Sequence, residues 1–344
     1  MIDGGVLTVT LSWRDGRRRT NIDAPPRVSL ARLLAGKPAA EAARLAGLVA
    51  ESCATAHEAA ARAAFGLAPR PADGRRMAAE ALREHAARCL VGWPVALGMP
   101  RATPPEDCAE TCRGAAALEA ALFGDGGLPD RIDALDAWMR RGETTPARVL
   151  DHVWRRWDGR WGRADLPLWR PGETAAAIDF DEAELDGAPF DISVAARVAD
   201  CRLMREVEAR RGRGLAWRLL ARLVDADRLL RGLRDEGPLC GSQPLGSGLG
   251  AAEAAGGAVL ACASLRDGRV TGFAQLTPTD CALHPEGLLR RMLDSLPQKR
   301  AAPAAALPAM VLEAVDVRAP TRLVVDAAPA ADAGPARRIG AAAS

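Results

Sequence analysis

Residues 258–276 read AVLACASLRDGRVTGFAQL, and this stretch decides the fold class. Two apolar segments flank the tripeptide Arg266-Asp267-Gly268. An Asp-Gly pair between two apolar runs is the sequence signal of a tight β-hairpin, because the turn needs residues that tolerate a positive φ angle. The stretch therefore predicts an antiparallel pair of strands late in the chain.

Short strands are also indicated near both ends of the chain. Residues 5–22, GVLTVTLSWRDGRRRTNI, alternate apolar and polar side chains around Asp15-Gly16 and predict a second hairpin. The segments MVLEAVDV (310–317) and RLVVD (322–326) are further strand candidates. Residues 327–344 are rich in Ala, Pro and Gly, which predicts a disordered tail.

The sequence between the two hairpins is mostly helical in character. Apolar residues recur at helical spacing, Ala is abundant, and Gly or Pro interrupts the pattern at intervals. The predicted helices are residues 28–66 with a break at 36–38, 74–91 ended by Gly92 and Pro94, 114–123, 129–141, 145–157 with Thr145 as N-cap, 194–236 with a break at 211–214, and 287–296.

The expected fold class is therefore mainly α with small β-hairpins (α+β). Residues 1–157 are expected to form a hairpin plus a helical region, and residues 158–236 an irregular connection and a long helical stretch. Residues 237–326 would form the C-terminal hairpin, loop and helix, followed by the tail at 327–344. We expect these regions to assemble as one compact unit.

Composition excludes several classes of protein. The net charge is only +2, so no strong field is directed at nucleic acid. No uncharged apolar run is long enough for a membrane span, and the first residues lack the pattern of a signal peptide. We therefore expect a cytoplasmic protein, in which the eight cysteines are buried, metal-binding or reactive thiols rather than disulfides.

Cys53 and His57 are the first candidate functional pair. They lie four residues apart in a helical stretch, so both can face one side and form half of a metal site. With Ser52 as N-cap, Cys53 would lie in the first turn, where the helix N-terminus lowers the pKa of a thiol. The alternative is a buried cysteine beside a hydrogen-bonded histidine, which the spacing alone favours.

Cys281 and His284 are the second candidate pair. They lie in the loop TPTDCALHPEG (277–287), which follows the late hairpin, and loops hold functional residues more often than core elements do. The alternative is a helix entry fixed by Pro278 and Pro285, with a buried cysteine beside them. The residues alone do not decide between the two interpretations.

Other possible sites are weaker. Cys108 and Cys112 have CxxxC spacing but no second thiol pair or histidine to complete a zinc site. Core burial is expected for the solitary cysteines Cys89, Cys201, Cys240 and Cys262 and for the cluster Trp154, Trp157 and Trp161. The sequence contains no phosphate-binding loop, no G-x-S-x-G elbow and no H-E-x-x-H motif, so we predict no enzyme activity.

Several segments, taken in order, resemble the large subunit of nickel–iron hydrogenases. The opening Ile2-Asp3-Gly4 is similar to that family's Ile-Glu-Gly start. Cys53-Ala-Thr-Ala-His57 resembles the end of its first ligand motif, R-x-C-G-x-C-x-x-x-H. The later segments follow in the family's order: Gly-x-Gly-x-x-Glu-Ala (248–254), the Arg-Asp-Gly-Arg-Val turn and the Pro-Thr-x-x-x-x-His-Pro-x-Gly loop (278–287). The resemblance implies a fold like that of the hydrogenase large subunit.

The departures from that pattern bear on function. Ala50 stands where the family's first cysteine would be, Ala255-Gly256 replace the family's arginine region, and the closing D-P-C-x-x-C-x-x-H is absent, with residues 315–322 near its place. Nickel would have almost no ligands, so hydrogen turnover and a nickel cofactor are not expected. The pattern resembles the HupK/HoxV type of hydrogenase maturation protein.

That resemblance implies a scaffold that transiently holds iron with its cyanide and carbon monoxide ligands for the large subunit. Cys53 corresponds to a cysteine that bridges iron and nickel in the family's enzymes. Cys281 is a candidate second ligand by position, or a partner maturation protein would supply the missing thiolate. The alternative is a metal-free chaperone that binds the immature large subunit or other maturation factors. Neither reading involves nucleic acid or a membrane span.

Overall fold

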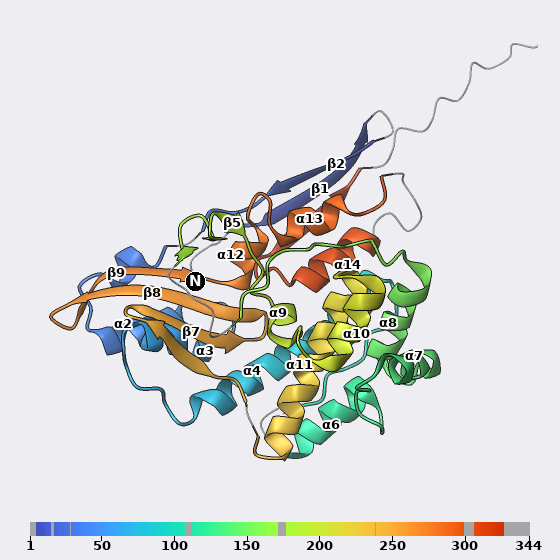
Figure 1. Ribbon diagram of the computed structural model, residues 1–344, viewed down its shortest axis with the longest axis horizontal. Helices are drawn as coiled ribbons and strands as arrows, with labels where there is room; N and C mark the ends of the chain where they lie inside the picture. Colours follow the sequence, from blue (N-terminus) through green and yellow to red (C-terminus); the bar gives the residue numbers. More distant parts are fainter. Residues whose placement is uncertain are drawn as a thin grey trace, which may run out of the picture.

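The computed structural model describes residues 5–14, 17–27, 29–106, 112–170, 177–237, 239–298 and 306–326. The expected tail at 327–344, the turn Asp15-Gly16, the opening Ile2-Asp3-Gly4 and Cys108 lie outside these residues. Figure 1 shows a largely helical molecule with small sheets, so the expected mainly α, α+β fold class is confirmed.

The late hairpin is confirmed and belongs to a larger sheet. Strands β8 (Gly257–Arg266) and β9 (Arg269–Leu276) pair antiparallel, and Asp267 and Gly268 between them both have positive φ angles of 53° and 71°. Strands β6 (Ser242–Gly246) and β7 (Leu249–Ala254), which the sequence did not predict, complete a sheet in the order β6-β7-β8-β9. Helix α3 (Ala54–Ala64), which begins directly after Cys53, packs on this sheet.

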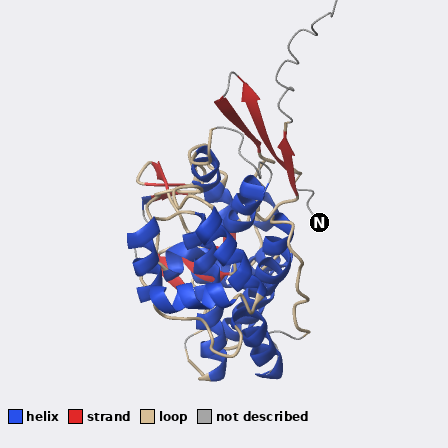
Figure 2. Cartoon of the chain, turned by 90° about the vertical axis from the view of Figure 1, so that its right-hand side faces the viewer, coloured by secondary structure: helices blue, strands red, loops and turns tan. Residues whose placement is uncertain are grey.

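The N-terminal hairpin is also confirmed, as β1 (Leu7–Arg14) and β2 (Arg17–Asp23). Strand β10 (Thr321–Val325), predicted at 322–326, joins this pair from the other end of the chain and runs parallel to β1, giving the order β10-β1-β2. The sheet stands at one end of the helical body, at the top of Figure 2. A small third sheet, β3 (Ile178–Asp179), β4 (Glu184–Leu185) and β5 (Ala188–Pro189), interrupts the expected irregular connection.

Helix α11 (Leu215–Arg234) is the central helix of the body. Its buried residues lie on all sides, as expected of a helix surrounded by others. The helices around it and near the sheets are α1 (Ala31–Leu34), α2 (Ala39–Leu48), α4 (Asp73–Ala87), α5 (Trp93–Ala96), α6 (Cys112–Phe123), α7 (Ile132–Arg141), α8 (Thr145–Arg156), α9 (Val194–Val198), α10 (Arg202–Arg211), α12 (Pro278–Ala282), α13 (Leu288–Asp294) and α14 (Ala306–Val315). None of the described helices combines the length and hydrophobicity needed to cross a bilayer.

Some local predictions were wrong. The strand expected at 310–317 is part of helix α14, because Leu307, Met310, Val311 and Val315 form one buried helical face. The helix expected to end at Gly92 and Pro94 continues through the π-helix η1 (Arg88–Gly92) into α5, where Pro94 lies in the first turn and its missing N–H is harmless.

Two helix starts differ from expectation. Thr144 caps helix α8 in place of Thr145, and its Oγ1 accepts a hydrogen bond from the Ala147 N–H at 3.3 Å. The segment 277–287, expected as a loop, contains helix α12, where Thr277 and Asp280 form a reciprocal capping box.

Gly250 on β7 allows α3 to lie close against the sheet. A Cβ atom at this position would collide with the backbone nitrogen of Ala64 and come within 2.5 Å of the Ala60 carbonyl oxygen. We expect Gly250→Ala to lower the free energy of unfolding by about 1–3 kcal/mol, because backbone atoms cannot move aside as a flexible side chain can. Denaturant unfolding followed by circular dichroism would measure this, with Gly272→Ala on β9 as the control, since its nearest atom would be 3.7 Å away.

Candidate functional site

A cavity of about 920 Å³ opens between the N-terminal segment, helix α3, the four-stranded sheet and the segment that leads to β10. Its polar and charged lining includes Cys53, His57, Gln275, Asp280, Asp316 and Arg318. The N-terminal side of the opening is formed by residues such as Pro25, Pro26, Leu30 and Leu48. The first candidate pair, Cys53 and His57, therefore shares one cavity.

Cys53 is held in an unusual backbone conformation. It is the N-cap of α3 and has φ 53° and ψ 42°, the left-handed region that costs a non-glycine residue free energy. The carboxylate of Glu80 on α4 replaces a local cap, since its Oε1 accepts hydrogen bonds from the Thr55 N–H at 3.3 Å and the Thr55 hydroxyl at 2.8 Å. The fold thus fixes where the thiol points.

The expected lowering of the Cys53 pKa by a helix N-terminus was wrong. Burial raises the pKa of this thiol, and the hydrogen bond from the Ala255 backbone and the positive charge of Arg318 only partly oppose it. The negative charges of Glu84 and Glu80 raise the pKa further. The thiol is therefore protonated at neutral pH, and a metal ion that binds it must displace the proton.

His57 lies on the first turn of α3 with its ring held by the sheet. Its Nδ1 is 2.9 Å from Oε1 of Gln275 on β9. Burial lowers the pKa of His57, so the imidazole is neutral, which is the protonation state that binds metals. The Nε2 atom remains as the ring nitrogen that could serve a ligand.

A cluster of charges at the base of the cavity was missed by the sequence reasoning. Arg318 forms ion pairs with Glu84 at 2.6 Å and Asp316 at 2.7 Å. Asp316 also pairs with Arg222 at 2.7 Å and Arg88 at 2.8 Å. Burial alone would raise the pKa of Asp316, but these guanidinium groups hold it below its usual range. The sequence placed residues 315–322, which include Asp316 and Arg318, near the family's closing motif, but it gave no sign of these ion pairs.

The second candidate pair lies elsewhere. The Cys281 side chain packs into a separate hydrophobic cluster with Trp169, Phe190 and Leu276, and Cys281 is not among the residues that line the cavity. Burial raises its pKa well above the usual value. This placement argues against the expected role of Cys281 as a second metal ligand.

His284 has both ring nitrogens engaged by its own surroundings. Nε2 lies 3.2 Å from a carboxylate oxygen of Glu184 on β4, and Nδ1 accepts a hydrogen bond from the Glu286 N–H at 3.0 Å. Like Cys281, it does not line the cavity. The structure therefore supports the alternative interpretation of this segment, a fixed helix entry.

The described residues hold no group of three or more His, Cys, Asp or Glu side chains that could bind a metal ion by themselves. Cys89 and Cys240 are buried, as expected of core cysteines. Cys201 and Cys262 are partly exposed. What the cavity offers is one soft ligand, Cys53, a neutral imidazole beside it and a guanidinium held in place by carboxylates.

Comparison with known proteins shows a curated relative. The chain is 33% identical over 310 residues to the hydrogenase expression/formation protein HupK of Rhodobacter capsulatus, covering 90% of this chain and 94% of that protein. No protein-family model matches the sequence.

Among solved structures, the fold resembles hydrogenases. The nickel–iron–selenium hydrogenase of Desulfovibrio vulgaris Hildenborough aligns over 89% of this chain and 94% of its own, with a TM-score of 0.53 and 14% identity. An NAD⁺-reducing nickel–iron hydrogenase aligns over 88% and 93%, with a TM-score of 0.54 and 14% identity. At these identities, the likeness concerns the fold.

Proposed function

Because the chain belongs to the family of the hydrogenase expression/formation protein HupK, we propose that it serves hydrogenase formation by carrying iron. The cargo would be iron with its cyanide and carbon monoxide ligands, held transiently and passed to the immature large subunit. The protein acts as an accessory factor in the cytoplasm and not as a hydrogenase.

The observation that supports this proposal most directly is the placement of Cys53. Cys53 is the residue that the resemblance aligns with a cysteine ligand of iron. It lines the cavity at the N-terminus of α3. Thiolates are good ligands for iron, and neutral imidazole suits it as well. The pair Cys53 and His57 is therefore the part of the chain that we assign to the cargo.

The rest of the cavity suits iron better than a nickel–iron pair. If Asp316 corresponds to the Asp of the family's closing D-P-C motif, Arg318 takes the place of a nickel-binding cysteine. A guanidinium cannot coordinate a metal ion. Two protein ligands, Cys53 and His57, do not complete the coordination of the iron. A partner protein would supply a further thiolate through the open side of the cavity.

We expect infrared bands from cyanide and carbon monoxide ligands when the protein is purified without oxygen from a host that expresses the hydrogenase maturation genes. Cys53→Ser should lose these bands, because its hydroxyl replaces the thiolate that binds iron. Cys281→Ala is the matched control and should keep them, because Cys281 packs into a separate cluster. Circular dichroism would show that both variants are folded.

Retention of the bands in Cys53→Ser would contradict the proposed site. Loss of the bands in Cys281→Ala, with the fold intact, would restore Cys281 as a ligand. Absence of the bands from the wild-type protein would contradict iron carriage.

One observation favours a second candidate function, a metal-free chaperone for the immature large subunit or other maturation factors. The described residues offer no complete set of metal ligands. This candidate predicts that a partner co-purifies with wild-type protein and Cys53→Ser alike, and that neither sample contains iron.

A further inference from the structure

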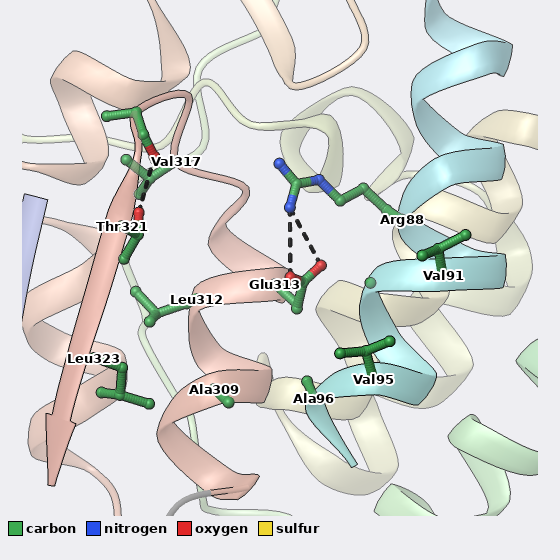
Figure 3. Close-up of a pocket in the computed structure, with 12 residues that line it drawn as sticks. Arg88, Val91, Val95, Ala96, Ala309, Leu312, Glu313, Val317, Thr321 and Leu323 are labelled. Atoms are coloured by element: carbon green, nitrogen blue, oxygen red, sulfur yellow. Dashed lines mark hydrogen bonds and ion pairs between the residues drawn. The ribbon is translucent and has the colours of Figure 1, made fainter. Parts of the chain in front are cut away.

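A groove of about 420 Å³ lies on the other side of the segment that forms the base of the Cys53 cavity. Ala319 in this segment lines both the groove and the cavity. Figure 3 shows Val91 and Val95 of η1 and α5 on one wall, Leu312 of α14 on the floor, and Leu323 of β10 on the opposite side. The Arg88–Glu313 ion pair, at 3.3 Å, joins η1 to α14 between these walls.

Strand β10 presents an unpaired backbone edge beside this groove. In the part of the chain that the structure describes, β10 pairs only with β1. The Pro320 carbonyl accepts a hydrogen bond from the Leu7 N–H, and the Asp326 N–H donates one to the Leu11 carbonyl. The backbone N–H and C=O groups of the even-numbered residues of β10 therefore point toward β1. Because backbone groups alternate along a strand, the N–H and C=O groups of Thr321, Leu323 and Val325 point away from β1, toward the open edge of the sheet.

The apolar lining of the groove also lacks a cover. Val95 is 59% exposed, and Val91, Leu312 and Leu323, which line the groove with it, are only partly buried. Thr321 and Leu323 project toward the groove from the face of the sheet that buries Leu7 and Val9 on β1. A fourth strand added beside β10 would hydrogen-bond to its free edge and place alternate side chains on Val95 and Leu312.

We infer that this groove is a docking site for an extended segment of a partner protein, which adds as a strand to β10 and inserts apolar side chains at alternate positions. An extended occupant is favoured over a helix because only an extended backbone satisfies a row of unpaired strand groups. The groove thus selects a partner by main-chain hydrogen bonds and by apolar pockets.

Two other occupants fit less well. Residues 327–344 contain Ile339 as their single large apolar residue, so they cannot supply apolar side chains at alternate positions. A second copy that paired its own β10 to this edge would continue the sheet with its helical body on the same face. That body would have to share this side of the sheet with η1 and α5, whose residues line the groove.

This inference rests on the proposed role in hydrogenase formation, which names the immature large subunit as a partner, so that subunit is the probe. In the complex, the amides of Thr321, Leu323 and Val325 should exchange hydrogen at least about tenfold more slowly than in the free protein. A helix docked in the groove would leave these amides unprotected and would overturn the inference.

Two variants test the groove by affinity. Val95→Asp places a charge against the docked strand and should weaken binding of the purified large subunit by about tenfold or more. Leu323→Pro removes an edge N–H that β1 does not use, so the sheet remains while docking is lost. The matched control is Leu265→Asp, which changes a 41% exposed leucine on the β8–β9 hairpin.

Weakened binding in Val95→Asp and Leu323→Pro, with Leu265→Asp unchanged, would support the inference. Equal binding by all variants, or no binding of the large subunit, would overturn it. Loss of the infrared bands of the iron ligands in Cys53→Ser is a separate result, because that substitution leaves the groove intact.

Discussion

Replacing Asp225 by alanine is expected to lower the free energy of unfolding by about 3–5 kcal/mol, because it leaves buried cations without their counter-charge. Asp225 is fully buried on α11. Arg197 reaches it with two nitrogens, at 2.6 Å and 3.0 Å, His85 lies at 2.8 Å and Arg228 at 3.1 Å. Burial disfavours the charge, yet these partners hold the pKa of Asp225 well below its usual value.

The structural effect of Asp225→Ala would extend to the wall of the cavity. Arg197 also donates hydrogen bonds to the carbonyl oxygens of Ala254 at 3.0 Å and Gly257 at 3.3 Å. Ala254 lines the cavity, and its neighbour Ala255 donates to the Cys53 sulfur. An Arg197 released from Asp225 would no longer hold this turn, so the position of Cys53 depends on the buried network.

Urea unfolding followed by far-ultraviolet circular dichroism would measure the effect. Asp235→Ala is the matched control, because this carboxylate is 63% exposed and, within the described residues, its ion pair is with its neighbour Arg234 at 3.2 Å. Its substitution should change stability by less than about 0.5 kcal/mol. Equal stability of Asp225→Ala and the control would mean that the network adds no net stability.

The protein is expected to lose stability as the pH falls from about 6.5 to 4, and His85 should account for up to about 3 kcal/mol of that loss. Burial lowers the pKa of His85 to about 4, and the charge of Arg222 acts in the same direction. Arg222 donates to Nδ1 at 3.0 Å, which leaves Nε2 as the protonated nitrogen facing Asp225. A second proton would have to displace the Arg222 contact.

The direction of this pH dependence follows from whether the folded or the unfolded protein binds the proton at the higher pH. Between pH 6.5 and 4 the unfolded chain takes up a proton at His85 that the folded protein rejects, so stability decreases as the pH falls. Above pH 6.5 the contribution of His85 is fully present. Burial also lowers the pKa of His57, which adds a loss in the same pH range.

The His85 contribution can be isolated by comparing the wild-type protein with His85→Gln across this range. The amide oxygen of Gln can accept from Arg222 and its nitrogen can donate to Asp225, but the side chain does not titrate. The variant should show a shallower decrease of unfolding free energy between pH 6.5 and 4. Identical slopes would show that His85 does not titrate in this way.

Local patterns in the sequence were sufficient for most of the secondary structure. The Asp-Gly turn predicted the β8–β9 hairpin because its geometry is decided within a few residues. Prediction failed where two backbone states suit the same residues. The apolar segment 310–317 suits a strand or a buried helix, and its packing in the body made it helical up to Val315.

The candidate site was only half predictable. Cys53 and His57 lie in one short helical stretch, so their spacing was enough to place them on one side of α3. Cys281 depended on the rotation of α12, which the capping box of Thr277 and Asp280 sets and which turns the thiol toward Phe190. Arg318 was not foreseen, because its partner Glu84 is distant in the sequence.

The sequence by itself determined which segments form helices and hairpins, the likeness to hydrogenase large subunits and the one cysteine that the family's first motif retains. Only the tertiary structure decided that β10 pairs with β1, that Arg318 reaches the cavity and that Cys281 does not. The physical reason is the separation in sequence between the residues that interact. Turns and helices follow from neighbouring residues, whereas these contacts join the two ends of the chain and depend on how the helical body packs between them.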